Sequence, residues 1–570
     1  MNDLILLNLD GDQLLGCDRV SPQGRQPVRL QAVTPSAAVI ELATDPAVRH
    51  IAWLDQRWAA SARPVHEWPA LLRQPLELLH YGAGQQTARA GQALGFVYFD
   101  TPYLLPAPTG NRVPTWLVSP AAGICRGDLF STHLFDPNAP TWTVALWAFA
   151  YRLMAGGAFP YSTPDLFTAP DQAVATAPKL VFTTWEAAWF VRRVYGAKWL
   201  PFWLAGEWWR RQRLPLATAL RAWFTSRPPA MDTQPLQALH AEVTESLTDA
   251  QEDGDQEVDV ILPTLCRPEH LQNVLEDLAR QTIPPCTVYV VDQRLPADAD
   301  VATKMPTLFR VEGKNWPFRL DHTVVNWVGA CRARNLALAK ASSRWVLFLD
   351  DDVRLDPVFL ANMLTAARRY QVGAVNATVV NPPFKKPTPA VPWPHAWARF
   401  GTCAGLVERT FATAIGGFDE RLEGGFGEDT EYGIRLRLTG ANIICLPNEI
   451  VRHLKAPRGG FRFDYPHPWR GGAVKPNPSP TVMLPRLIHD SPDMLAGYRL
   501  HYTLGALAHT SCWRWPQKLR EVDQGWAASL HWAAYLRDHS PAPTRCETVK
   551  IKNWKRRKTG SNKHLRQECE

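Results

Sequence analysis

Three consecutive carboxylates, Asp350, Asp351 and Asp352, are the residues of this chain best suited to hold a metal ion. They follow Val346–Leu349, an uninterrupted apolar run that is typical of a strand buried on both faces. Open α/β sheets bind ligands at the carboxyl ends of their strands. Adjacent carboxylates repel one another by roughly 4 kcal/mol per pair at about 4 Å and an effective dielectric of ~20, so a divalent cation carrying a diphosphate would compensate them. An acidic turn capping the helix that begins at Asp356-Pro357 is the alternative.

The elements that position these acids form an alternating pattern. From Val258 onward, apolar strand-like runs alternate with helical patterns, which predicts an α/β fold with a mainly parallel sheet and right-handed crossovers. Val258–Leu262 and Thr287–Val291 predict the first two strands, and Gly329–Lys340 predicts the helix before the acidic triplet. Parallel strands end at one edge of a sheet, so Pro263, Thr264 and Asp292 are expected to lie near the acids.

The motifs of this region, taken in order, resemble the family 2 glycosyltransferases of the GT-A fold. The resemblance covers roughly residues 256–460 and is carried by Val260-Ile261-Leu262-Pro263-Thr264, Val290-Val291-Asp292, Ala333-Arg334-Asn335, Asp350-Asp351-Asp352, Gly416-Gly417-Phe418-Asp419-Glu420, Gly427-Glu428-Asp429 and His453. It implies a nucleotide-diphosphate sugar as donor and a metal ion, Mn²⁺ or Mg²⁺, that bridges the two phosphates.

The same resemblance assigns roles to single residues. Asp352 looks like the metal ligand, and His453 resembles the additional ligand of the family, with a buried, hydrogen-bonded histidine as the alternative. The remaining donor-binding residues are Pro263, Thr264 and Asp292 at the nucleoside, Asp351 near the ribose, Asp350 in support and Arg334 paired with the nucleotide. The chain has Gln293 where many relatives have a second acid, so the identity of the donor's nucleobase is left open. A structural or solvated charge is the alternative for Arg334.

Asp429 is predicted to be the general base of an inverting transfer, because a carboxylate must take the proton of the acceptor hydroxyl. The glycine-rich turn ending at Gly427 lets the backbone approach the acceptor, and Glu428-Asp429 begin the following helix. Capping of that helix by an acidic first turn is the alternative.

The chain divides by composition into five parts. We expect a Trp-rich N-terminal domain at 1–225, a linker at 226–257, the catalytic domain at 258–480, a helical extension at 481–540 and a basic, disordered tail at 541–570.

Short segments of the first half are similar in sequence to segments of the second half. Arg49–Arg57 resembles Arg344–Asp352, and Phe135-Asp136 and Tyr151–Gly156 have later counterparts in the same order, which predicts an internal repeat: a truncated, non-catalytic GT-A-like domain. Arg57 would stand in the place of Asp352 and Ala145 in the place of Asp429, and neither side chain can do the chemistry. Such a domain would pack, position the acceptor or bind a partner. Chance similarity within an unrelated helical domain is the alternative.

Composition limits the kinds of partner and the cellular location that we expect for this chain. The net charge of +8 is modest for 570 residues and does not indicate a nucleic-acid partner. The ten cysteines include no Cys-x-x-Cys pair, and the N-terminus does not read as a secretory signal. We therefore expect a cytoplasmic protein, with peripheral contact at the inner membrane face, that transfers sugar to a glycan or lipid-linked acceptor. An inactive carbohydrate- or partner-binding scaffold and a nucleotidyltransferase are the alternative functions.

Overall fold

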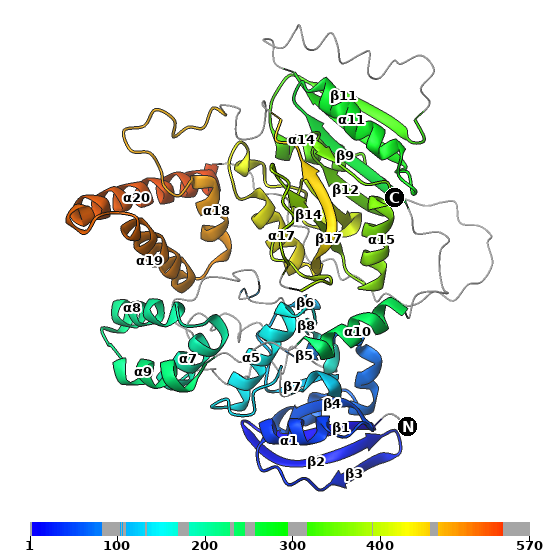
Figure 1. The fold of residues 1–570 in the computed structure, drawn as a ribbon, viewed down its shortest axis with the longest axis vertical. Coiled ribbons are helices and arrows are strands. Elements are labelled where there is room, and N and C mark those ends of the chain that lie inside the picture. Colours follow the sequence, from blue (N-terminus) through cyan, green and yellow to red (C-terminus); the bar gives the residue numbers. More distant parts are fainter. Residues whose placement is uncertain are drawn as a thin grey trace.

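The computed structural model describes residues 3–81, 103, 105, 110–131, 134–168, 182–227, 233–245, 257–294, 316–389, 391–456 and 465–539. The tail predicted at 541–570 lies outside them. Two β-sheets with their helices, one in each half of the chain, lie one above the other in Figure 1. A group of helices lies beside each sheet.

The C-terminal sheet is built around β9 (Val258–Thr264). Parallel neighbours of β9 are β10 (Thr287–Gln293), which pairs onward with β11 (Arg319–Val325), and β12 (Trp345–Leu349) on its other side. Beyond β12 come β16 (Ala404–Glu408), β14 (Ala374–Val380), β17 (Ile443–His453) and the short strands β13 (Val353–Arg354) and β15 (His395–Ala396). The α/β prediction with a mainly parallel sheet is confirmed.

Helices join these strands as the sequence predicts. They are α11 (Pro268–Ala279), α14 (Ala330–Leu338), α15 (Phe359–Arg369), α16 (Arg409–Ala414) and α17 (Glu428–Leu438). In α11, the apolar residues Leu271, Val274, Leu275 and Leu278 are spaced for one helical face, and all four are buried. The crossover through α11 therefore returns the chain to the sheet with its acid-bearing strand ends at one edge.

The N-terminal sheet has the order β3-β2-β1-β4-β7-β5-β8-β6. Its strands are β1 (Asp3–Asp10), β2 (Gln13–Ser21), β3 (Gly24–Val28), β4 (Val48–Asp55), β5 (Glu77–His80), β6 (Val113–Pro114), β7 (Ala122–Arg126) and β8 (Phe159–Ser162), with helices α1 (Pro35–Ala43) and α5 (Trp142–Ala155). The run β1-β4-β7-β5-β8-β6 has the same order and strand directions as β9-β12-β16-β14-β17-β15.

The register repeats as well. Trp53 pairs with Gly123 in the N-terminal sheet and Phe348 with Gly405 in the C-terminal sheet, in each case two residues before the aspartate that follows or ends the strand. The predicted internal repeat is thereby confirmed in strand order and register. The sheets differ next to the first strand, where β2 returns antiparallel to β1 in place of a helical crossover to a parallel strand. This is the truncation that the short segment before Asp55 predicts.

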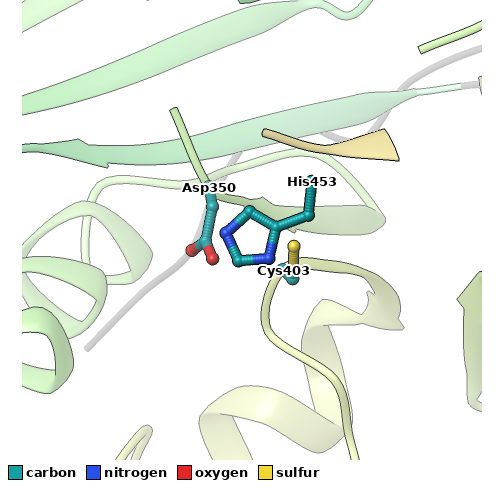
Figure 2. A group of neighbouring side chains, drawn as sticks. All are labelled: Asp350, Cys403 and His453. Carbon is teal, nitrogen blue, oxygen red and sulfur yellow. The ribbon is translucent and has the colours of Figure 1, made fainter. Parts of the chain in front are cut away.

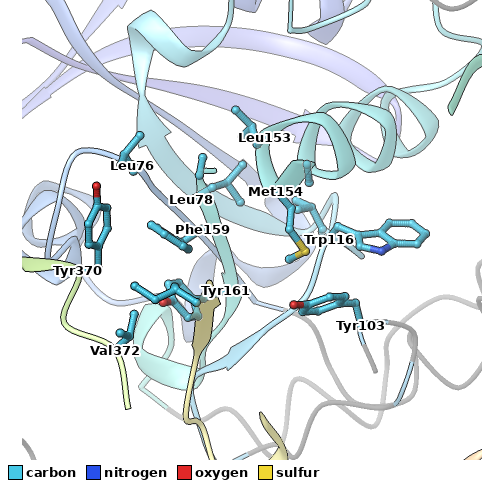
Figure 3. Close-up of a cluster of buried hydrophobic side chains, with 14 of the residues drawn as sticks. Leu76, Leu78, Tyr103, Trp116, Leu153, Met154, Phe159, Tyr161, Tyr370 and Val372 are labelled. Carbon is cyan, nitrogen blue, oxygen red and sulfur yellow. The ribbon is translucent and has the colours of Figure 1, made fainter. Parts of the chain in front are cut away.

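The two halves pack through buried side chains that Figure 3 draws together, from Leu76, Leu78 and Phe159 on one side to Tyr370 and Val372 on the other. Tyr370 and Val372 precede β14, so this contact lies at the amino edge of the C-terminal sheet, opposite the acids. Hydrogen bonds at 2.6 Å from Trp393 Nε1 to the Gly156 carbonyl and at 3.4 Å from Asn111 Nδ2 to the Leu438 carbonyl join the halves.

The helices outside the sheets are α7 (Thr184–Phe190), α8 (Trp199–Arg211), α9 (Leu216–Thr225), α10 (Gln234–Glu245), α18 (Pro480–His489), α19 (Pro492–Ala508) and α20 (Trp515–His539). The linker predicted at 226–257 did not anticipate α10, which buries Leu236, Leu239 and Val243. In the part of the chain that the structure describes, no helix combines the length and apolarity needed to cross a bilayer.

Candidate active site

The acidic triplet follows β12 directly, and its three side chains have different surroundings. Asp351 is buried and accepts hydrogen bonds from Thr264 Oγ1 at 2.6 Å and from Arg267 Nη1 at 2.7 Å. Burial raises the pKa of Asp351 to about 7, against the lowering effect of Arg267 and Thr264. Asp351 thus ties the ends of β9 and β12 together, with Pro263 and Thr264 both buried at the end of β9. Its contact with a ribose remains a prediction.

Asp352 and His453 lie together, as the resemblance implies. The short pairing of β13 with β17 places Val353 opposite His453, and His453 Nε2 lies 3.1 Å from Asp352 Oδ1. The other carboxylate oxygen accepts the Ala456 amide at 2.8 Å and lies 3.4 Å from Arg267 Nη1. Burial by itself would raise the pKa of Asp352, but His453, the amide and Arg267 together hold that pKa well below its usual range. Asp352 is therefore ionised at neutral pH.

His453 also faces Asp350 and Cys403. One ligand atom of each of these three residues lies within 4.8 Å of the others, and Figure 2 shows the imidazole between the carboxylate and the sulfur. Burial raises the pKa of the Cys403 thiol well above its usual value, followed by the charges of Asp350 and Asp352. The carboxylate of Asp350, the sulfur of Cys403 and the imidazole of His453 are thus close enough to hold one divalent cation, and Asp352 adjoins this group through His453.

Arg334 links the triplet to the predicted base. Its side chain is 4% exposed, and its Nη2 lies 3.1 Å from Asp350 Oδ1. The pKa of Arg334 is raised, because the charges of Asp350, Glu428 and Asp429 outweigh the effect of burial. The pair with Asp350 fits the alternative of a structural charge, and the contact of Arg334 with a nucleotide remains a prediction.

Burial shifts the pKa of the Asp429 carboxyl. Burial raises its pKa, while Arg334 and a 2.9 Å hydrogen bond from Thr402 Oγ1 lower it. The pKa of neighbouring Glu428 rises to about 7 through burial and the charge of Asp429. A carboxylate whose pKa is raised toward the working pH is a better proton acceptor than a fully solvated one. Helix capping alone does not account for the bond to Thr402.

The turn before α17 requires glycine. Gly427, the N-cap residue, has φ +114°, and an added Cβ would lie 2.8 Å from the Thr481 carbonyl oxygen of α18. Only glycine adopts this conformation without strain. The close approach of α18 thus fixes the position at which Glu428 and Asp429 begin the helix.

Asp292 lies at the same edge but is held by protein groups. Its Oδ2 accepts Arg294 Nη2 at 2.6 Å and lies 3.1 Å from His322 Nε2. Gln293 Oε1 accepts the Gly329 amide at 2.7 Å, so this glutamine fixes the start of α14. Asp292 as a nucleoside contact remains a prediction.

Sequence reasoning missed Arg267, Thr402 and Cys403. No local pattern marks them, because each acts through a partner more than 25 positions away in the chain.

The parallel strands with acids after β12 are the arrangement that the resemblance to the GT-A glycosyltransferases implies. Residues 259–404 match the sequence model of Glycosyl transferase family 2. The match covers the segment that contains most of the motifs on which the predicted resemblance rests.

Several solved structures are similar at low identity. A TarS fragment of S. aureus, residues 1–349 in complex with UDP-GlcNAc, has 16% identity and a TM-score of 0.33, covering 49% of this chain and 88% of the fragment. Against the longer S. aureus TarS structure the values are 16% and 0.28, with 35% of this chain and 37% of that one covered. The mannosyltransferase PcManGT of Pyrobaculum calidifontis, in complex with GDP-Man and Mn²⁺, has 18% identity and a TM-score of 0.30, covering 53% and 91%. No curated protein matches the sequence.

Proposed function

We propose that this chain is a metal-dependent, inverting glycosyltransferase, with residues 258–480 as its catalytic domain. It moves a sugar from a nucleotide-diphosphate sugar to a hydroxyl group of a glycan or lipid-linked acceptor in polysaccharide or cell-surface glycan synthesis at the cytoplasmic side of a membrane. The observation that carries the proposal is that Asp350 and His453 lie in one group of candidate ligands, with Asp352 3.1 Å from His453 and Arg334 paired with Asp350 within electrostatic reach of Asp429.

Each group has a step that suits its chemistry. Asp429 accepts the proton of the acceptor hydroxyl as that oxygen bonds to the anomeric carbon and the bond to the diphosphate oxygen breaks on the opposite face, which inverts the configuration. Asp352, His453 and Asp350 would hold Mn²⁺ or Mg²⁺, and the ion would supply Lewis acidity for the diphosphate when bound. Pro263, Thr264, Asp292 and Asp351 form the edge on which the nucleoside would lie.

The test separates donor binding from transfer. A panel of nucleotide sugars is screened by thermal shift with Mn²⁺, with Mg²⁺ and with EDTA. We expect a donor whose stabilising effect requires metal, and we expect Asp352→Asn to lose that metal-linked shift. Asp429→Asn should keep the shift and lose about 10²- to 10⁴-fold in transfer rate. Asp538→Asn, at an exposed position on α20, is the matched control and should behave as wild type.

Three results would contradict the proposal in different ways. Transfer by Asp429→Asn at the wild-type rate removes Asp429 as the base. Absence of any metal-linked nucleotide-sugar binding by the wild-type chain favours the inactive scaffold, whereas release of pyrophosphate from a nucleoside triphosphate favours nucleotidyl transfer.

A further inference from the structure

The helix α9 exposes its large apolar side chains to solvent and buries small ones. Its buried positions are the small residues Ala219 and Ala222. Four apolar residues at the spacing of one helical face point outward instead, namely Leu216 (55% exposed), Leu220 (60%), Trp223 (41%) and Phe224 (68%). Isolated exposed apolar residues are ordinary, but a continuous outward stripe marks an interaction surface.

The turn that joins α8 to α9 adds to this surface. Trp208, Trp209 and Leu214 flank the turn, and each is more than half exposed. The segment from Lys198 to Arg227 contains six Lys or Arg residues and one acid. That acid, Glu207, is buried and paired with Arg211 at 3.2 Å. The hairpin therefore presents aromatic rings among positive charges.

A second hairpin of the same character is formed by α19 and α20. Trp513 is 80% exposed at its turn, and Trp515 is exposed beside it. Arg514, Lys518 and Arg520 lie in the same stretch, and the first acid after it, Glu521, pairs with Lys518 at 3.2 Å. The two hairpins touch, because the ring of His501 on α19 stacks on Trp199 of α8 with centroids 5.9 Å apart. Both turns lie at the left edge of the molecule in Figure 1.

We propose that these two hairpins form a docking surface for a membrane that contains anionic lipid. Tryptophan is favoured at the level of lipid headgroups, where its ring meets the apolar region and its N–H meets water. Arginine and lysine around the rings complement lipid phosphates, and an amphipathic surface of this kind binds in the plane of the interface without crossing the bilayer. The charge of the surface selects lipid over a second copy of the chain, since two copies would bring like charges together. The surface lies outside the proposed active site, so its test does not depend on sugar transfer.

The experiment measures sedimentation of the full chain with vesicles of phosphatidylcholine alone and of phosphatidylcholine mixed with phosphatidylglycerol. The apolar variant combines Leu220→Ser, Phe224→Ser and Trp513→Ser, and the charge variant combines Arg213→Glu and Arg514→Glu. Val33→Ser is the matched control, since Val33 is 84% exposed and precedes α1. All proteins keep residues 541–570, so the basic tail contributes equally.

We expect the wild type and Val33→Ser to sediment with the anionic vesicles and to be released by high salt. The apolar and charge variants should each bind at least about tenfold more weakly. Failure of the wild type to bind anionic vesicles, or equal binding by all variants, would overturn the proposal. So would a concentration-dependent dimer, seen by sedimentation velocity without vesicles, that the apolar variant abolishes while no protein binds lipid. Unchanged unfolding temperatures establish that the variants are folded.

Discussion

Replacing Arg334 with Met removes a buried positive charge that acts on both the acidic triplet and Asp429. The guanidinium is buried and paired with Asp350 at 3.1 Å, so its loss leaves Asp350, Glu428 and Asp429 facing one another. Truncating one partner of a buried ion pair costs about 3–5 kcal/mol. A nearby opposite charge lowers a carboxyl pKa by about 1–3 units, so the pKa of Asp429, already raised by burial, should rise further by a similar amount.

The loss of Arg334 should shift both the pH–rate profile and the pH dependence of stability. A general base works when deprotonated, so the acidic limb of the kcat/KM profile should move to higher pH by about 1–3 units. A carboxyl whose folded pKa lies above its unfolded value destabilises the fold at pH above that pKa and ceases to do so as the pH falls. The stability deficit of Arg334→Met should therefore be largest at alkaline pH and should narrow on acidification.

The measurements are the pH–rate profile with the donor identified by thermal shift, and chemical unfolding at several pH values. Arg421→Met is the matched control, because Arg421 is also buried and pairs with Asp419 at 2.7 Å. It should lose comparable stability and leave the acidic limb in place. A folded Arg334→Met whose acidic limb coincides with that of wild type would refute the electrostatic link between Arg334 and Asp429.

Two further predictions concern the supports of the site. Gly427→Ala combines a strained φ with a contact to the Thr481 carbonyl, so it should lower the free energy of unfolding by more than the roughly 1–3 kcal/mol of backbone strain alone. Gly471→Ala, at φ +75° in open space, is the control that measures the strain alone. Equal shifts in denaturation midpoint for the two variants would contradict the role of the contact. Asp277 is buried, yet hydrogen bonds from Arg354 at 2.7 Å and the Leu355 amide at 3.1 Å hold its pKa below the usual value. The stabilising effect of Asp277 is present above pH ~4 and is lost as the pH falls through the folded pKa. Asp277→Asn should therefore be less stable than wild type at neutral pH and should lose less stability than wild type on acidification. Urea unfolding at several pH values measures both.

The strand and helix order of the C-terminal half could be predicted because local signals agree there. Val258–Leu262 and Thr287–Val291 are continuous apolar runs, and the apolar spacing of α11 has one buried face. The meeting of Asp352 with His453 was predictable only through the resemblance, since the two residues are far apart in the chain.

The partners of the acids could not be predicted in the same way. Arg267 and Arg334 are ordinary charges at helix positions in the sequence, and only the folded chain shows that each faces an aspartate. The helix α10 was missed because its buried set is short and lies between segments with no apolar pattern. Likewise, the exposed stripe of α9 has the spacing of a buried face, so the sequence gives no sign that it points outward.

The repeated halves show how two sheets can share an architecture while the residues beyond their strand ends differ. Strand order and register depend on buried pairs such as Trp53 with Gly123, whereas catalysis depends on a few residues just beyond the strand ends. In the N-terminal half, Arg57 occupies the position of Asp352 and is tied to Asp55 by an Nε–Oδ1 hydrogen bond of 2.8 Å, and the first turn of α5 contains no acid.

The contact between the halves is reciprocal. Trp393, two residues before β15, donates a 2.6 Å hydrogen bond to the carbonyl of Gly156. Arg112, one residue before β6, lies against Gly440, the counterpart of Gly156 in the repeat. Interfaces in which the same surface of two similar units meets itself are the rule in symmetric dimers, and here the two units are joined in one chain. Because this interface covers the amino edge of the C-terminal sheet, the N-terminal half supports the catalytic half from the side away from the acids. The α8–α9 hairpin, part of the proposed docking surface, belongs to the same N-terminal half and lies outside the proposed active site.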